Sequence, residues 1–235
     1  MSAGAGTRTA VVAGATSASG VALVRRLVAD GLTVVAVGSH AGRLDAAFAD
    51  LGGVDRQACD LTDETAVLAL ADRVRTDHGG VDALFHLVGG WRGGKGITTQ
   101  TTEDYGFLHR SVFTTLFNTS RAFYDQLAAR GGRLAAISAT AVAAPTAANA
   151  SYAAVKASVD AWVQAVADGF ARDGTTAAAS VVVVRALVDD AMRAQHPDRP
   201  FKGYTHVDDL AAILAGLPGA PAAEVNGTRI DAVRG

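Results

Sequence analysis

A strand, a glycine turn and a helix follow one another between Thr9 and Asp30, and this order limits the possible folds more than any other stretch. Residues 9–13 are predicted to form a short buried strand, and residues 21–30 a helix with apolar periodicity. The turn between them, residues 14–20, consists of small residues. Amide groups at a helix N-terminus attract anions, so we expect a phosphate group over this turn.

The turn has two of the three glycines that dinucleotide-binding turns usually contain. Gly14 permits the tight turn and Gly20 lets the helix approach the strand, while Ala18 stands where the middle glycine is expected. The expected pyrophosphate contacts come from Gly14, Thr16, Ser17, Ala18, Ser19 and Gly20. The alternative is an ordinary turn of small residues between a strand and a helix.

Strands and helices alternate along the rest of the chain, which predicts an α/β fold with a parallel sheet. Further strands are predicted at residues 33–37, 56–59, 83–88, 133–138, 180–184 and 227–233. Helices are predicted at residues 43–51, 63–78, 103–129, 149–172 and 207–215. We expect a single Rossmann-type, doubly wound domain over residues 1–235, with about seven strands. Residues 185–205 lack clear periodicity, so we expect a substrate lid there.

Composition argues against several other classes of protein. The net charge is −2 and the signs are mixed along the chain, so we expect neither nucleic acid nor a membrane as partner. Cys59 is the only cysteine and the six histidines lack ligand spacing, so no disulfide or metal is expected. No apolar run reaches the ~18 residues of a membrane helix, and the start lacks a signal-peptide core. These features predict a cytoplasmic protein with a small-molecule substrate.

Tyr152 and Lys156 are four residues apart on a predicted helix, so they lie on one face of it. A tyrosine hydroxyl with a pKa of ~10 is a poor acid-base group at neutral pH, and a nearby ammonium favours its ionised form. Such a pair can pass a proton to a substrate oxygen or nitrogen. The alternative is a surface lysine beside a helical tyrosine.

These features together resemble the short-chain dehydrogenase/reductase family over nearly the whole chain. The shared motifs are the turn at 14–20, Asp60-Leu61 after the third strand, Tyr152-x-x-x-Lys156, and Asn-Gly-Thr-Arg-Ile at 226–230. The resemblance implies NAD(P)H-dependent reduction, with Tyr152 as proton donor. It implies that Lys156 lowers the pKa of this tyrosine and binds the nicotinamide ribose. The cofactor contacts that it implies outside the turn are Asp60 and Leu61, with Val88, Gly89 and Gly90.

Several positions depart from the family pattern. The family's Asn-Asn-Ala-Gly after strand four is His86-Leu-Val-Gly89, and its Pro-Gly after strand six is Arg185-Ala186. Its catalytic serine is replaced by Ala139, and the asparagine of the long helix is absent near Ser111-Val112. Ser138 is a candidate substrate contact in place of that serine, although alternation along a strand turns it to the other face.

Gly89-Gly90-Trp91 is similar to the motif of the dihydropteridine reductase branch, which also lacks the serine. A planar pterin could stack on Trp91, although this residue could instead anchor the loop. We therefore expect reduction of a pterin-like or other conjugated small molecule. The alternatives are a carbonyl or imine reductase of secondary metabolism and a non-catalytic, dinucleotide-binding regulatory protein.

Cofactor choice depends on the end of the second predicted strand. An acidic residue there would bind the ribose 2′-hydroxyl of NAD, but the sequence is Gly38-Ser39-His40. Ser39, His40 and Arg43 could receive a 2′-phosphate, which favours NADP over NAD, although Arg43 could instead be a solvated helix residue. Family members pair through the helices predicted at 103–129 and 149–172, so the resemblance also implies a homodimer or homotetramer.

Overall fold

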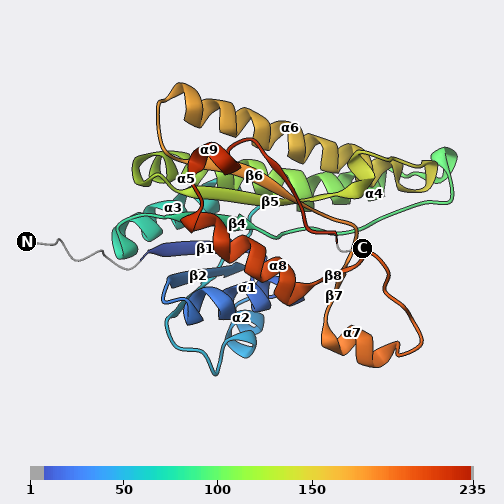
Figure 1. The fold of residues 1–235 in the computed structure, drawn as a ribbon, viewed down its shortest axis with the longest axis horizontal. Coiled ribbons are helices and arrows are strands. Elements are labelled where there is room, and N and C mark those ends of the chain that lie inside the picture. Colours follow the sequence, from blue (N-terminus) through green and yellow to red (C-terminus); the bar gives the residue numbers. More distant parts are fainter. Residues whose placement is uncertain (1–7, 234–235) are drawn as a thin grey trace, which may run out of the picture.

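Seven parallel strands form the central sheet in a computed structural model that describes residues 8–233 (Figure 1). Their order in the sheet is β3 (Val54–Ala58), β2 (Thr33–Gly38), β1 (Thr9–Ala13), β4 (Ala83–His86), β5 (Arg133–Ala139), β6 (Ala178–Val184) and β9 (Arg229–Asp231). The order changes direction between β1 and β4. Ligands of open α/β sheets bind at the carboxyl ends of the strands beside such a point. The predicted Rossmann-like fold with seven parallel strands is confirmed.

Helices cover both faces of the sheet, as Figure 1 shows. One face packs against α3 (Glu64–His78), α4 (Thr102–Leu108), α5 (Thr115–Arg130) and α6 (Ala150–Arg172). The other face packs against α1 (Ala18–Ala29), α2 (Ala41–Ala47) and α8 (Val207–Gly216). The short α9 (Ala222–Val225) precedes β9. β1 and β6 are buried along their whole length, and apart from Thr9 and Ser180 their residues are apolar, which is typical of parallel strands covered on both sides.

The long helix predicted at residues 103–129 is interrupted. A π-helical segment (His109–Thr114) separates α4 from α5. Inside it, the Ser111 carbonyl accepts a hydrogen bond of 2.8 Å from the Thr115 hydroxyl. Such segments occur mainly as single turns within α-helices and are common at functional sites. The prediction of one regular helix was therefore wrong at this turn.

Residues 185–205 contain short regular elements that the sequence did not predict. β7 (Leu187–Val188) pairs in parallel with β8 (Thr205–His206), and α7 (Asp190–Gln195) lies between them. Figure 1 shows α7 projecting from the body of the molecule. These elements have only two to six residues, which is too short for periodicity to reveal them.

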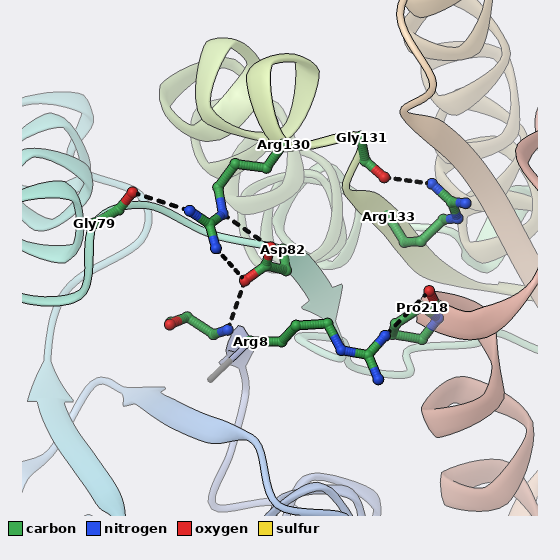
Figure 2. A network of polar contacts seen from close by, with 8 residues as sticks. Arg8, Gly79, Asp82, Arg130, Gly131, Arg133 and Pro218 are labelled. Atoms are coloured by element: carbon green, nitrogen blue, oxygen red, sulfur yellow. Dashed lines mark hydrogen bonds and ion pairs between the residues drawn. The ribbon is translucent and has the colours of Figure 1, made fainter. Parts of the chain in front are cut away.

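Polar contacts join the amino ends of the central strands (Figure 2). The glycine turn lies at the opposite, carboxyl end of these strands. The Asp82 carboxylate accepts hydrogen bonds from the Thr9 amide at 2.7 Å and from Arg130 Nε at 2.8 Å. Arg130 also donates to the Gly79 carbonyl. Asp82 therefore ties the start of β1 to the ends of α3 and α5.

Candidate active site

The turn after β1 has the geometry of an anion site. Gly14 has a φ of +82°, and a Cβ at Gly20 would lie 2.4 Å from the Gly14 carbonyl oxygen. Ser17 caps α1, because its hydroxyl accepts a hydrogen bond of 3.0 Å from the Gly20 amide. Within residues 8–233, the amides of Ala18 and Ser19 have no hydrogen-bond acceptor. These amides begin the helix, so they can bind a phosphate group.

A cavity of about 230 Å³ lies beside this turn, at the carboxyl ends of the first strands. It is lined by Gly14, Thr16, Ser39, Asp60, Leu61 and Val88 from the predicted set, together with Gly38, Cys59, Thr62, Ser111 and Thr115. Predicted residues from separate stretches of the sequence thus meet around one space.

Asp60 is held ready to accept a hydrogen bond in this cavity. Its Oδ1 accepts from both the amide and the hydroxyl of Thr62, at 2.9 and 2.7 Å. These hydrogen bonds lower the pKa of Asp60, so it is a carboxylate at neutral pH. In the described part of the chain Oδ2 has no partner, so it can accept from a ligand such as an adenine amino group.

The side chains of Ser39 and Arg43 contact each other at the end of β2. Arg43 Nη2 donates a hydrogen bond of 3.2 Å to the Ser39 hydroxyl. His40 caps α2 through its backbone and is exposed. Among residues 8–233, Arg43 forms no ion pair with a carboxylate. Its guanidinium can therefore bind an added phosphate next to Ser39.

Tyr152 and Lys156 lie one turn apart on α6, as their spacing predicts. Lys156 is buried, and its Nζ donates a hydrogen bond of 2.7 Å to the Ile137 carbonyl on β5. Nζ lies 5.9 Å from the centroid of the Tyr152 ring. Burial lowers the pKa of Lys156 to about 8, because the charged form is removed from water.

The pKa of Tyr152 differs from the expectation. The resemblance implies that Lys156 lowers it, but in the structure burial raises the pKa of Tyr152. Desolvation disfavours the phenolate, and Nζ is directed at the Ile137 carbonyl. Tyr152 is therefore a neutral hydroxyl that can donate a proton.

A second cavity, of about 420 Å³, opens beside Tyr152. Apolar lining comes from Trp91, Ala139, Ala141 and Ala144. Polar lining comes from Tyr152, Thr140, Thr146, Asn149 and Arg185. A tyrosine hydroxyl in a largely apolar cleft, with a few polar groups around it, is suited to a small organic ligand.

Trp91 belongs to this cavity, whereas Ser138 does not line it. Trp91 is 64% exposed, and a Cβ at Gly93 would lie 2.5 Å from its indole ring, so the ring rests on the loop backbone. Ser138 is fully buried in β5, and its hydroxyl has no hydrogen-bond partner within residues 8–233. Ala139, not Ser138, faces the cavity. Gly89 and Gly90 lie in the loop before Trp91, and Gly90 packs against the Phe107 ring.

His86 forms a buried polar cluster that sequence reasoning missed. Its Nε2 lies 3.1 Å from the Thr115 hydroxyl, and its Nδ1 lies 3.2 Å from the Thr119 hydroxyl. Burial, and then the charge of Lys156, lower the pKa of His86 to about 3, so the imidazole is neutral. The sequence did contain a signal for this cluster, because His86 is a polar residue inside an otherwise apolar predicted strand. The cluster ties the end of β4 to the helix that follows the π-helical segment.

Two further properties concern what the described residues lack. No helix within residues 8–233 is long and apolar enough to cross a membrane. Over the same range, no three His, Cys, Asp or Glu side chains come together as metal ligands.

Comparison with known proteins gives the family. Residues 8–196 match the family model described as short chain dehydrogenase. A structure of a short-chain type dehydrogenase/reductase from Mycobacterium ulcerans aligns with a TM-score of 0.86 and 22% identity, over 96% of this chain and 88% of that one. NAD+-bound xylitol dehydrogenase aligns with a TM-score of 0.85 and 18% identity, over 99% and 100% of the chains.

A variant of actinorhodin polyketide ketoreductase, with NADPH, is also similar, with a TM-score of 0.83 and 23% identity over 97% and 96% of the chains. At these identities the solved structures show the shared fold. The family model covers most of the chain, including the glycine turn and the Tyr152–Lys156 pair. The chain belongs to the short-chain dehydrogenase family of NAD(P)-dependent oxidoreductases.

Proposed function

We propose that this protein reduces a conjugated small molecule with NADPH, and that Tyr152 donates the proton. The observation that carries the proposal is the position of Tyr152, a neutral hydroxyl beside buried Lys156 that lines an apolar cavity. The loop after β4 borders both cavities, because Val88 lines the one beside the glycine turn and Trp91 the one beside Tyr152. A cofactor and a substrate could thus meet at this loop.

The chain's own residues fit a dinucleotide. The free amides of Ala18 and Ser19 would hold its pyrophosphate, and Asp60 Oδ2 would accept from the adenine. Ser39 and Arg43, with His40 beside them, would bind a 2′-phosphate, so we propose NADPH rather than NADH. When bound, the nicotinamide supplies the hydride. Tyr152 would deliver a proton to the substrate, and Lys156, one turn away on α6, would hold the nicotinamide ribose.

A pterin-like ring is the substrate that this cavity favours. Ala139 provides no hydroxyl to polarise a ketone oxygen, whereas a conjugated ring needs a hydride and a proton without that contact. Exposed Trp91 offers a face for stacking. This arrangement is the basis for proposing a relative of the dihydropteridine reductases. A carbonyl or imine reductase is the second candidate, because Tyr152 alone can protonate such an oxygen or nitrogen.

We also propose that residues 185–205 act as a lid. Arg185 lines the cavity beside Tyr152, and α7 projects from the same segment (Figure 1). A segment anchored by the short β7–β8 pair could move without disturbing the seven-stranded sheet. Closure over a substrate would exclude water from the reaction.

The first experiment measures nucleotide binding, by titrating NADPH and NADH while following nucleotide fluorescence and thermal shift. Binding of NADPH in preference to NADH supports the proposal. Absence of binding by either nucleotide at millimolar concentration would overturn the cofactor and catalytic assignments together.

The second experiment tests the proton donor with Tyr152→Phe, using NADPH and quinonoid dihydropterin. Loss of the hydroxyl should slow turnover by about a hundredfold or more, while NADPH affinity is unchanged. Tyr105→Phe, which alters an exposed tyrosine on α4, is the matched control. Undiminished turnover in Tyr152→Phe would remove this residue from the mechanism. No turnover in either form, with NADPH bound, would favour a regulatory dinucleotide-binding protein.

We propose that the protein forms a homodimer or homotetramer through α5 and α6. These helices border an outward cavity of about 400 Å³ that includes Tyr124, Trp162 and Val166. The rings of Phe117 and Trp162 pack at its edge with a tilt of 47°, and their centroids are 4.8 Å apart. Size-exclusion chromatography at micromolar concentration tests this, and a monomer there would count against it.

A further inference from the structure

Arg185 is an exposed, charged side chain that also lines the cavity beside Tyr152. It follows β6 directly, and the last residue of β6, Val184, is the register partner of Ala139. The two strand ends therefore bring Arg185 beside the position where the family pattern has its catalytic serine. Arg185 lines the same cavity of about 420 Å³ as Tyr152 and Trp91.

The segment 201–203 holds the guanidinium in place. Arg185 Nη1 donates a hydrogen bond of 3.2 Å to the Lys202 carbonyl. A Cβ at Gly203 would lie 3.1 Å from Nη1 and 3.3 Å from Cδ, so the glycine leaves room for the side chain. Phe201 has a φ of +45°, the one positive value at a non-glycine residue within 8–233. The backbone at Gly203 thus lies directly against the arginine side chain.

The remaining donors of Arg185 have no partner in the described part of the chain. No carboxylate within residues 8–233 pairs with it, and Nε and Nη2 make no hydrogen bond there. The polar neighbours on the cavity wall, such as Thr140 and Asn149, are neutral. An exposed, planar guanidinium with free donors on the wall of a mostly apolar cavity matches a carboxylate, which it can bind through two parallel hydrogen bonds.

We infer that Arg185 binds a carboxylate of the substrate, so that the substrate class is a conjugated ring that carries a carboxylate. The inference rests on the proposed reductase function, because it takes the cavity beside Tyr152 as the substrate site. Trp91 contacts the ring and Arg185 the carboxylate, and together they orient the reacting atom toward Tyr152. Arg185 is thus a specificity residue, and it takes no part in proton transfer.

The test compares compounds that share one aromatic ring system and differ in the group attached to it. Isothermal titration calorimetry measures the binding of 2-naphthoate, 2-naphthamide and 2-naphthyl phosphate to the full chain saturated with NADP+. We expect the carboxylate to bind about tenfold more tightly than the amide. Arg185→Gln should remove this difference, and Trp91→Leu should weaken both compounds. Arg193→Gln, which alters an arginine on α7 outside this cavity, should change nothing.

Three results would refute the proposed role of Arg185, and a fourth would change the ligand that it binds. Equal affinities for carboxylate and amide, a preference that persists in Arg185→Gln, or no binding of the carboxylate at about 10 mM would refute it. Tighter binding of the phosphate than of the carboxylate would assign a phosphate in place of the carboxylate. NADP+ binding is measured separately, so failure of NADP+ to bind would identify failure of the proposed function. Thermal shift and NADP+ affinity of Arg185→Gln show whether the variant is folded.

Discussion

Lys156 shows how one buried charge can oppose folding. Its ammonium lies in the apolar layer under α6, with the Ile137 carbonyl as its hydrogen-bond acceptor. Below a pH of about 8, the folded protein must keep this charge away from water. The cost of that desolvation belongs to the folded state alone, so Lys156 makes stability depend on pH.

The first prediction concerns this dependence. The pKa of Lys156 falls from 10.5 to about 8 on folding, so between these values the unfolded chain binds more protons. The free energy of unfolding should therefore rise with pH relative to Lys156→Met, by about 2 kcal/mol from pH 7 to pH 9.5. Urea unfolding without nucleotide measures it. Lys95→Met, which removes an exposed lysine, is the control. A parallel pH profile in Lys156→Met and the native protein would contradict the prediction.

Arg43 gives a second prediction at the scale of one residue. Because it is bonded to Ser39 and has no acidic partner in residues 8–233, it should contact a 2′-phosphate. Arg43→Ala should weaken NADPH binding by about tenfold and leave NADH binding unchanged. Fluorescence titration measures both affinities. Arg25→Ala, which removes an arginine paired with Asp50, is the matched control. Equal losses for the two nucleotides would refute a role in selecting the phosphate.

At the scale of elements, the turn between β1 and α1 depends on close backbone contact. A Cβ at Gly20 would lie 2.7 Å from Ala15 and closer still to the Gly14 carbonyl, and backbone atoms cannot easily move aside. Gly20→Ala should therefore lower the free energy of unfolding by about 2 kcal/mol or more and abolish nucleotide binding.

Gly42→Ala is the control for this substitution. Gly42 lies in α2, and a Cβ added there would meet no atom of a neighbouring element within 4 Å, so alanine should raise stability by about 0.5–1 kcal/mol. Thermal denaturation and NADPH titration measure both variants. Nucleotide binding retained by Gly20→Ala would show that the turn tolerates a wider approach of helix and strand.

Regular elements were predictable where a pattern ran long enough to be recognised. The strand at residues 9–13 and the helix at 63–78 follow from apolar patterning and from the cap at Asp63, which accepts from the Thr65 amide. The π-helical segment left no such signal, because its sequence, His-Arg-Ser-Val-Phe-Thr, contains no glycine or proline that would mark an interruption of the helix. Elements as short as β7 and β8 depend on tertiary pairing rather than on local sequence.

The candidate site was predictable in part, because the carboxyl ends of all strands in a parallel sheet lie on the same side of the sheet. Ser39, Asp60 and Val88 could be placed together from their positions alone, and the structure places them on one cavity. The partners of His86 and Arg185 could not be assigned in this way. These partners, the Thr115 hydroxyl and the Lys202 carbonyl, are brought to His86 and Arg185 only by packing of distant segments.

At the scale of the whole molecule, the Asp82 network joins segments that are remote in sequence. Its carboxylate is 13% exposed and accepts from Arg130 and from the Thr9 amide (Figure 2). Asp82→Ala should lower the free energy of unfolding by about 3 kcal/mol, because it leaves Arg130 and a backbone amide without their acceptor. NADPH affinity should be unchanged, since this network lies at the amino ends of the strands.

Urea unfolding and NADPH titration test the prediction. Asp50→Ala, which removes the exposed partner of Arg25, should cost less than about 1 kcal/mol. Equal stability of Asp82→Ala and Asp50→Ala would assign the network no role in folding. Weaker NADPH binding in Asp82→Ala would show that the amino and carboxyl ends of the strands are energetically coupled.

The Asp82 network and the candidate site lie at opposite ends of the strands, and this separation has a consequence for protein engineering. The contacts of Asp82 and Arg130 lie at the amino ends of the strands, and the loops that carry Trp91 and Arg185 lie at the carboxyl ends. A library that randomises only those loops would vary the lining of the proposed substrate cavity while inheriting an unaltered stabilising network. Most members should therefore still fold, and this chain could serve as a scaffold for evolving oxidoreductases.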